Sequence, residues 1–275
     1  MLIAVASTDG EMVNEHFGRA SRFWIFDISK SQLILGLLLL IIFGPVNSNA
    51  GSAVNVGVAA NFAPALELIG KRFTAETGIG VQLTISSSGQ LFSQIRNQAP
   101  LDLYLSADTR RPEMLYEKGF CEEPVRYAVG KTVLWSRNTG LCALRQWQDV
   151  LNSAAVQRIA MANPQTAPYG TVALDSCRQL ENWREIEKKL VYGSNVVQAF
   201  QYAATGVADA SFIARSLALT DKAKGGCVWE VSGSAPVEQK ACVVRHRPGK
   251  REASRLLEYI TSEKTADIRQ RLGYQ

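Results

Sequence analysis

The sequence predicts an α/β fold with mainly parallel sheets, divided into two lobes. From residue 54 onward, short runs of alternating apolar residues, typical of strands, take turns with segments whose apolar residues recur at helical spacing. Strands and helices that alternate in this way favour a parallel sheet covered by helices. The pattern occurs in two successive sets and the chain then returns, which indicates two lobes with a cleft between them.

The first set of elements lies between residues 54 and 119. In order, we expect a strand over 54–58, a helix that Asn61 opens and Gly78 ends, a strand over 81–85, a helix capped by Ser86, Ser87 and Ser88, a strand over 101–105, and a helix that Thr109 starts and Gly119 stops. In the first of these helices, Leu66, Ile69 and Phe73 share one face, which is typical of a helix packed on a core.

The second set of elements follows from residue 133. We expect strands over 133–135 and 158–162, helices over 171–180 and 196–205, and a strand over 208–213. A hairpin is expected across Val228–Val244, followed by a last helix with Ala253, Leu256, Leu257 and Ile260 on one face.

Polar helix starts follow strands at four places. These places are Asn61, the cluster Ser86–Ser88, the run Pro168–Gly170 and the run Ser194–Val196. The first N–H groups of a helix have no partner inside the helix, and the helix dipole adds partial positive charge there. Each serine or asparagine alone is explained as an ordinary N-cap. Four such starts, with side-chain donors from Asn61 and the serines, would together form a cage for an anion.

Six motifs carry a resemblance to a known family. They are, in order, AANF (59–62), SSSGQL (86–91), APLDLYLSAD (99–108), ANP (162–164), APYG (167–170) and GSNV (193–196). This set is similar to the motifs of periplasmic molybdate-binding proteins, the receptors of ABC importers. The similarity spans residues 54–275, and its APLDLYLSAD and APYG blocks seldom occur together elsewhere.

The resemblance implies which residues hold the ligand. They are Asn61 after the first strand, Ser88 before the second helix, and the backbone N–H groups of Tyr169 and Val196 at two later helix starts. One position departs from the better-known branch of the family, because Ala214 stands where that branch places a tyrosine hydroxyl on the anion. A second branch, with asparagine first and tyrosine in the APYG turn, lacks that hydroxyl too, and this chain resembles it.

The resemblance also implies an architecture and a role. It implies a type II periplasmic-binding-protein fold, with lobe one over 54–129 and 239–275 and lobe two over 130–238. The expected role is to capture molybdate, and tungstate as well, and to deliver it to the membrane permease and ATPase of an ABC importer. We expect a periplasmic monomer without catalytic residues, without a cofactor, and without a metal site beyond the oxyanion.

Three alternatives stay open at this point. One is a receptor for another ligand, such as sulfate or ferric ion, and another is a carrier of the nitrogenase iron–molybdenum cofactor. The third is an enzyme on the same fold, which the residues disfavour. Residues 51–275 hold one histidine, His246, and no glycine-rich phosphate loop. Asp102 and Asp108 are interpreted as structural caps rather than as an acid–base pair.

Charge alone decides little. The net charge is +5, and residues 51–275 hold 27 basic and 21 acidic residues, a net of +6. A basic surface suits an anionic ligand, but equally suits nucleic acid. The one dense basic run, Arg245–Arg251, has no interleaved aromatic residue. We therefore expect a solvated turn leading into a helix there, and no nucleic-acid partner.

The first fifty residues contain two different segments. Residues 1–29 resemble the start of the nitrogenase iron–molybdenum cofactor-binding family, including its histidine motif at His16-Phe17-Gly18, and residues 2–7 and 23–28 predict a hairpin. So short a fragment cannot bury a core, which favours a truncated gene fusion or a start codon placed too far upstream. Residues 30–50 resemble a signal peptide, with an apolar run over Leu33–Phe43 and small residues at Ser48 and Ala50.

Five cysteines lie after residue 120, and none shows a Cys-x-x-Cys spacing typical of metal sites. Their number fits an exported protein better than a cytosolic one, although one must stay unpaired. If Val231 faces Glu238 in the expected hairpin, the same register places Cys227 opposite Cys242. The sequence therefore predicts a possible disulfide between Cys227 and Cys242.

Overall fold

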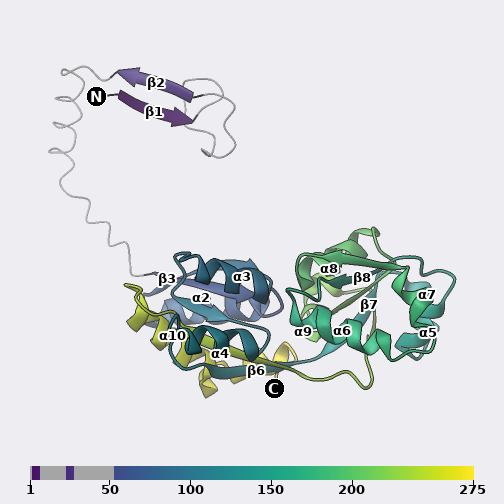
Figure 1. Cartoon of the computed structure of the whole chain (residues 1–275). Helices are drawn as coiled ribbons and strands as arrows, with labels where there is room; N and C mark the ends of the chain where they lie inside the picture. The colour runs from purple at the N-terminus through teal and green to yellow at the C-terminus, as the bar shows by residue number, and fades with distance from the viewer. Residues whose placement is uncertain (1, 7–22, 28–52) are drawn as a thin grey trace. The chain divides into compact units, whose positions relative to one another are not determined.

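The computed structural model describes residues 2–6, 23–27 and 53–275 (Figure 1). The chain divides into two units, residues 1–50 and 51–275. In the first unit, β1 (Leu2–Ala6) pairs antiparallel with β2 (Phe23–Asp27), which confirms the predicted hairpin. The histidine motif at 16–18 and the signal-like segment at 30–50 lie outside the described residues. None of the helices among the described residues is both long and apolar enough to span a membrane.

Lobe one is built on a five-stranded sheet with the strand order β4-β3-β5-β12-β6. The strands are β3 (Ala53–Ala59), β4 (Gly80–Ser86), β5 (Leu103–Leu105), β6 (Val125–Gly130) and β12 (Val237–Val243). Strands β3, β4 and β5 are parallel, whereas β12 runs antiparallel to β5 and β6. The alternation of Val54, Val56 and Val58 points these three side chains into the core, where each is fully buried.

Helices cover both faces of this sheet. The helices are α2 (Ala63–Thr77), α3 (Ser88–Arg96), α4 (Arg110–Glu117), α10 (Lys250–Thr261), α11 (Ala266–Arg271) and the short 3-10 helix η3 (Glu263–Thr265). Helices α2, α10 and α11 share one apolar cluster with the sheet, and α3 and α4 share another. The predicted apolar faces of the first and last long helices are buried, as the periodicity required. On the α3 face, a Cβ at Gly57 would lie 2.8 Å from a Leu101 methyl, so glycine permits the close packing there.

Lobe two is built on a second five-stranded sheet with the order β11-β7-β10-β8-β9. The strands are β7 (Thr132–Ser136), β8 (Ile159–Ala162), β9 (Leu190–Gly193), β10 (Ala210–Ala214) and β11 (Cys227–Glu230). Strands β8, β9 and β10 are parallel, and β7 runs antiparallel to β10 and β11. The predicted α/β fold with two lobes is confirmed.

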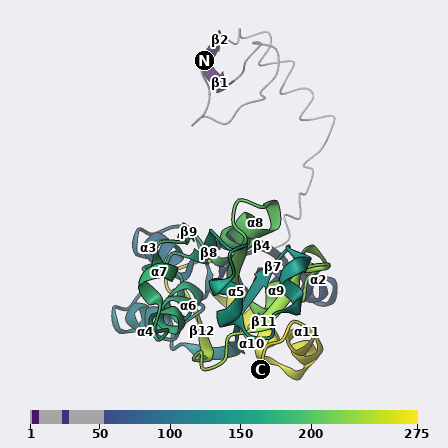
Figure 2. The same cartoon turned by 90° about the vertical axis from the view of Figure 1, so that its right-hand side faces the viewer.

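The helices of lobe two lie on both faces of its sheet (Figure 2). They are α5 (Trp147–Asn152), α6 (Pro168–Arg178), α7 (Trp183–Glu187), α8 (Val196–Thr205), α9 (Arg215–Ala218) and the 3-10 helices η1 (Thr139–Ala143) and η2 (Asp221–Ala223). Helices α5, α6 and α7 bury apolar side chains in one cluster. Helices α8 and α9 contribute to another cluster, which also contains Ala59, Ala60 and Ala107 of lobe one. Apolar packing therefore joins the two lobes.

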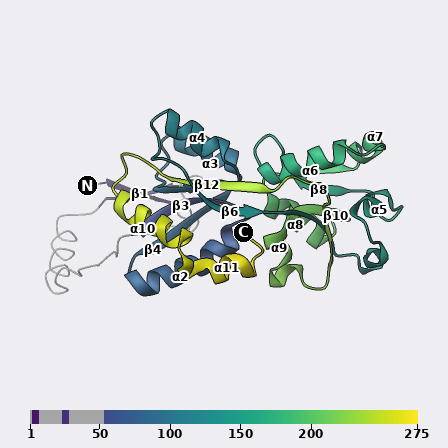
Figure 3. The same cartoon turned by 90° about the horizontal axis from the view of Figure 1, so that it is seen from below.

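The chain crosses between the lobes twice (Figure 3). It leaves lobe one after β6, which ends at Gly130, and returns between β11 and β12, over residues 231–236. The sequence placed the lobe boundaries at 129/130 and 238/239, and in the structure β6 ends at Gly130 and β12 begins at Val237. Both crossings run beside each other because β6 pairs with β12, so the lobes are connected by two adjacent strands.

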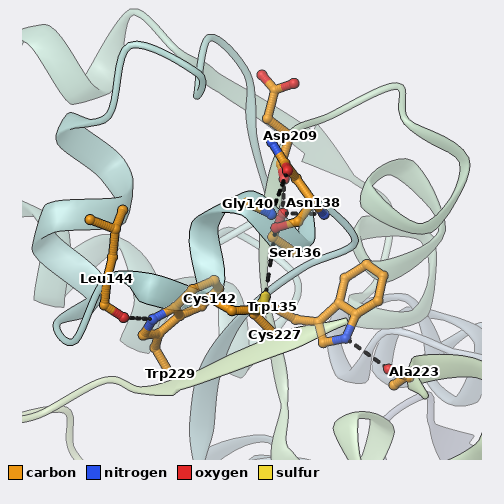
Figure 4. The surroundings of a disulfide bond; sticks show 10 residues. All are labelled: Trp135, Ser136, Asn138, Gly140, Cys142, Leu144, Asp209, Ala223, Cys227 and Trp229. Atoms are coloured by element: carbon orange, nitrogen blue, oxygen red, sulfur yellow. Dashed lines mark hydrogen bonds between the residues drawn. A yellow bond between two sulfur atoms is a disulfide. The ribbon is translucent and has the colours of Figure 1, made fainter. Parts of the chain in front are cut away.

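The hairpin predicted across Val228–Val244 is wrong. Strand β11 pairs with β7 in lobe two, whereas β12 pairs with β5 and β6 in lobe one. Cys227 and Cys242 thus belong to different sheets, and the predicted disulfide between them does not form. Cys227 is bonded to Cys142 instead, with 5.4 Å between the Cα atoms (Figure 4). Cys242 is a buried free thiol. Alternation identified both strands correctly but carries no information on their partners.

The Cys142–Cys227 disulfide fastens η1 to the start of β11, on the edge of the lobe-two sheet. Next to it, the Trp229 indole N–H donates to the Leu144 carbonyl at 2.8 Å, and Trp135 donates to the Ala223 carbonyl at 3.2 Å (Figure 4). Buried indoles therefore hold the loop after η1 and the η2 segment before β11 to the sheet.

Replacing Cys142 by serine should lower the free energy of unfolding by about 2–4 kcal/mol, because the bond closes a loop with a sequence separation of 85 residues. Chemical denaturation of the parent and of Cys142→Ser measures the difference. The parent with the bond opened by a reductant, which loses the same bond without a substitution, is the control. A non-reducing peptide map in which Cys227 is joined to any other cysteine would contradict the assignment.

Candidate functional site

A small cavity lies between the two lobes. Its interior leaves about 10 Å3 for the centre of a water-sized sphere, which is about the room that one water molecule needs. All four residues predicted to hold the ligand, Asn61, Ser88, Tyr169 and Val196, line it. The full lining is Ala59, Ala60, Asn61, Ser86, Ser87, Ser88, Ala107, Ala167, Pro168, Tyr169, Asn195 and Val196.

Three helices begin at the cavity. Helix α3 starts at Ser88 behind a capping box of Ser87 and Gln90, and α6 starts at Pro168. Helix α8 starts at Val196. The Asn195 carboxamide oxygen accepts from the N–H groups of Val197 and Gln198, both at 3.0 Å. Each helix start adds a partial positive charge, roughly half an elementary charge at full alignment. The cavity is therefore electropositive without any charged side chain.

The backbone N–H groups of Asn61, Ser88, Tyr169 and Val196 donate no hydrogen bond within residues 53–275. Neighbouring N–H groups do: Ala60 donates to the Ser86 carbonyl at 2.9 Å, and Gly89 donates to the Thr166 carbonyl at 2.8 Å. Buried donors without a partner are costly. Four of them belong to residues that line one cavity, so a hydrogen-bond acceptor placed there could accept from several of them.

Ser88 offers a second donor. Its Oγ accepts the Ala107 N–H at 2.9 Å, which fixes the oxygen and leaves the hydroxyl proton free to point elsewhere. The Ser88 carbonyl accepts from the Tyr104 hydroxyl at 2.8 Å. Burial raises the pKa of Tyr104 well above its usual value, so this donor keeps its proton. Ser88 is therefore held from both sides.

The Asn61 side chain differs from the expectation. It was expected to donate to the anion, but its Nδ2 donates to Gln239 Oε1 at 2.8 Å and to the Tyr274 hydroxyl at 3.2 Å. Both amide protons are thus taken by protein groups. Only the backbone N–H of Asn61 remains for a ligand. Both partners lie more than 170 residues away in the chain, so no local pattern could show them.

The Tyr169 hydroxyl is directed away from the helix starts. It accepts from Gln239 Nε2 at 3.4 Å, and a Cβ placed on Gly130 would lie 2.0 Å from it. Neither Gln239 nor Gly130 lines the cavity. Burial raises the pKa of Tyr169 well above its usual value. Ala214, at the position where the better-known branch has its tyrosine, is fully buried and does not line the cavity either.

The lobes also touch on the outer side of the cavity. There a groove of about 780 Å3 lies beside it. Gly89 of α3 contacts Thr166 of lobe two at this point, and the Arg111 guanidinium, paired with Asp108, donates to the Gln165 carbonyl at 3.1 Å. Because Gly89 and Thr166 follow and precede residues of the cavity, these contacts separate the cavity from the groove.

Other candidate groups have structural roles. Asp108 accepts the Arg111 N–H at 3.0 Å in the first turn of α4 and so acts as a cap, whereas Asp102 accepts the Asn55 N–H of β3 at 2.9 Å and caps no helix. The basic run forms a turn into α10, and Arg245 and Lys250 pair with Glu122. Within residues 53–275, no cluster of His, Cys, Asp or Glu side chains is placed to hold a metal ion.

Two family models match the chain. Residues 54–275 match that of the bacterial extracellular solute-binding proteins, and residues 1–81 match that of the dinitrogenase iron-molybdenum cofactor family. The two matches overlap over residues 54–81, which form β3, α2 and the start of β4 in lobe one.

Sequence relatives cover almost the whole chain. The molybdate-binding protein ModA of Azotobacter vinelandii is 34% identical over 254 residues, covering 90% of this chain and 98% of the relative. That of Rhodobacter capsulatus is 32% identical over 240 residues, covering 86% and 93%.

Solved structures of similar fold include one of the same kind of protein as these relatives. The periplasmic molybdate-binding protein of Azotobacter vinelandii superposes with a TM-score of 0.75 at 31% identity, covering 81% of this chain and 98% of that one. The sulfate-binding protein SubI of Mycobacterium tuberculosis has a TM-score of 0.67 at 13% identity, covering 81% and 86%, and shares the fold alone. The chain therefore belongs to the family of bacterial extracellular solute-binding proteins, as a relative of the ModA proteins.

Proposed function

We propose that residues 54–275 form a receptor that captures molybdate or tungstate and delivers it to the permease and ATPase of an ABC importer. The observation that carries this proposal is the set of four unpartnered backbone N–H groups in one small, uncharged cavity. Asn61, Ser88, Tyr169 and Val196 would donate these protons to the oxyanion, and Ser88 would add its hydroxyl. The names of the ModA relatives support molybdate as the ligand.

Neutral donors suit an oxyanion that must be both held and selected. The cavity has no lysine or arginine in its lining, so hydrogen bonds and helix dipoles would balance the charge. An anion of the wrong size would leave buried donors unpaired, at a cost of about 1–3 kcal/mol each. Fixed backbone donors can thereby select by size where a flexible cationic side chain would adapt.

The cavity argues against two of the alternatives, a receptor for ferric ion and an enzyme. A ferric ion needs oxygen ligands with negative charge, but the lining contains no carboxylate and the Tyr169 hydroxyl is turned away. A catalysed reaction would need an acid, a base or a nucleophile beside the ligand. Apart from the serine hydroxyls, no side chain of the lining is placed to act in one of these roles. The receptor is proposed to act without a catalytic step or a cofactor, and as a monomer. Sulfate, also a tetrahedral dianion, is the remaining competitor.

The location follows from the same proposal. A receptor of this kind acts outside the cytoplasmic membrane, and the Azotobacter relative of known structure is described as periplasmic. We propose that residues 30–50 direct export and that cleavage occurs after Ala50. The exported protein would then begin at Gly51, and mass spectrometry of periplasmic protein that retains residues 1–50 would contradict this.

Calorimetric titration of the full chain with molybdate, tungstate, sulfate and phosphate tests the ligand. Molybdate and tungstate should bind with similar strength. Sulfate and phosphate should bind at least about a hundredfold more weakly, because a mismatch that leaves one or two donors unpaired costs about that much. Equal affinities for sulfate and molybdate would refute the proposed selectivity.

Ser88→Ala should weaken molybdate binding by about tenfold to a hundredfold, since it removes one donor to the anion and leaves the Ala107 N–H unpaired. The matched control is Ser93→Ala on the same helix, whose hydroxyl bonds only to the Gly89 carbonyl. Its affinity should equal that of the parent. The assignment of Ser88 fails if both variants titrate alike.

Gly89→Ala should weaken molybdate binding by about tenfold to a hundredfold, because its Cβ would lie 2.9 Å from the Thr166 Cα across the cleft. The added methyl obstructs closure without touching the ligand. Gly70→Ala is the control, since its Cβ would meet only Val81, at 3.4 Å or more. The melting temperature of each ligand-free variant should equal that of the ligand-free parent. If Gly89→Ala binds molybdate as tightly as the parent, the lobes close in a different way.

A further inference from the structure

A buried hydrogen-bond network lies behind the cavity and centres on Asn61. We call it the Asn61 network, and it comprises Asn61, Tyr127, Tyr169, Ser216, Gln239 and Tyr274. Each of these residues is 4% exposed or less. Only Asn61 and Tyr169 also line the cavity, so the other four cannot reach the ligand directly.

In lobe one, the network holds the Asn61 side chain and carbonyl. Gln239 Oε1 accepts from Asn61 Nδ2 at 2.8 Å and from the Tyr127 hydroxyl at 3.0 Å. The Tyr274 hydroxyl donates to the Asn61 carbonyl at 2.7 Å and accepts from Nδ2 at 3.2 Å. These contacts fix two polar atoms of Asn61, Nδ2 and the carbonyl oxygen, and leave its backbone N–H free.

Lobe two joins the same network through two hydroxyls. Ser216 Oγ, on α9, donates to the Asn61 carbonyl at 2.9 Å and lies 2.9 Å from the Tyr274 hydroxyl. The Tyr169 hydroxyl, on α6, accepts from Gln239 at 3.4 Å. Both bonds cross from one lobe to the other, and both end on groups that position Asn61.

Asn61 lies in a turn that its neighbours hold, with the Ala60 N–H on the Ser86 carbonyl and the Phe62 N–H on the Ala59 carbonyl, both at 2.9 Å, and the network adds bonds to Asn61 itself. Asn61 follows β3 and precedes α2, whose first residue is Ala63 and whose N-cap, Phe62, makes no side-chain cap bond. The Asn61 N–H lies in the planar peptide that joins Asn61 to Ala60, and bonds to the carbonyl and side chain of Asn61 limit the rotation of the residue that carries this N–H. Ser216 contributes to that only while the lobes are closed.

We propose that Ser216 is a positioning residue for the oxyanion, with the Tyr169 hydroxyl as its auxiliary. Closure of lobe two brings the Ser216 hydroxyl onto the Asn61 carbonyl and thereby holds the Asn61 N–H on the ligand. Anion binding and lobe closure become one cooperative event. This inference rests on the proposed function, in that the ligand is an oxyanion held by the Asn61 N–H.

The test compares the parent with Ser216→Ala in the full chain. Titration and stopped-flow dissociation with molybdate should show a dissociation constant raised about threefold to tenfold, the range expected for one neutral hydrogen bond, mainly through faster dissociation. The melting temperature of the ligand-free variant should match that of the ligand-free parent, because water replaces the cross-lobe bond when the lobes part. The molybdate-bound variant should melt below the molybdate-bound parent.

Two further variants sharpen the comparison. Ser176→Ala is the matched control, since its hydroxyl bonds to the Val172 carbonyl within α6 and does not cross the cleft, and it should dissociate like the parent. Tyr169→Phe keeps the backbone N–H but removes the second cross-lobe bond, so it should change dissociation in the same direction as Ser216→Ala.

The outcomes separate the two proposals. If Ser216→Ala releases molybdate like the parent, or destabilises the ligand-free and bound proteins equally, the positioning role is wrong while the receptor function stands. If the parent binds sulfate or phosphate but not molybdate, the ligand is wrong, and the same variants then test the positioning role with the anion that binds. If the parent binds none of the four anions, both proposals are wrong.

Discussion

The unpartnered N–H groups at three helix starts and in the turn between β3 and α2 are the constraint on which the rest of the structure depends. Four such groups lie in residues around one small cavity between the lobes. Each buried donor without an acceptor costs about 1–3 kcal/mol, so a closed cleft in which nothing accepts these bonds would carry a penalty of several kcal/mol. An oxyanion that accepts these bonds removes the penalty. In the proposed receptor, closure would therefore be favourable chiefly when the ligand is present, which is the behaviour a receptor needs.

The fold places these donors through its strand directions. Asn61 and Ser88 follow β3 and β4, which are parallel neighbours in lobe one, and Tyr169 and Val196 follow β8 and β9, which are parallel neighbours in lobe two. The carboxyl ends of parallel strands share one sheet edge, where ligands of open α/β sheets bind. Since the two edges face each other across the cleft, two donors come from each lobe, and neither lobe holds the complete set.

The local features of this site could be predicted from the sequence, and its long-range features could not. Strand alternation and helix starts are encoded within a few residues, and the family motifs pointed to the four residues that meet at the cavity. The disulfide, the strands with which β11 and β12 each pair, and the partners of the Asn61 amide all depend on residues far apart in the chain. A polar residue at a helix start can serve either as ligand or as support. Only the tertiary structure shows that Asn61 serves as support with its side chain.

The interactions that hold the cleft closed act on two sides of the cavity. On the outer side, Gly89 and Arg111 bond to lobe two, and on the inner side Ser216 bonds to Asn61. Burial raises the pKa of Tyr127 and Tyr169 well above their usual values, so the inner network keeps its protons, and its bonds, near neutral pH. Release of the anion then requires that the lobes be drawn apart against both sets of bonds, a task suited to a transporter that binds the lobes and is driven by ATP hydrolysis.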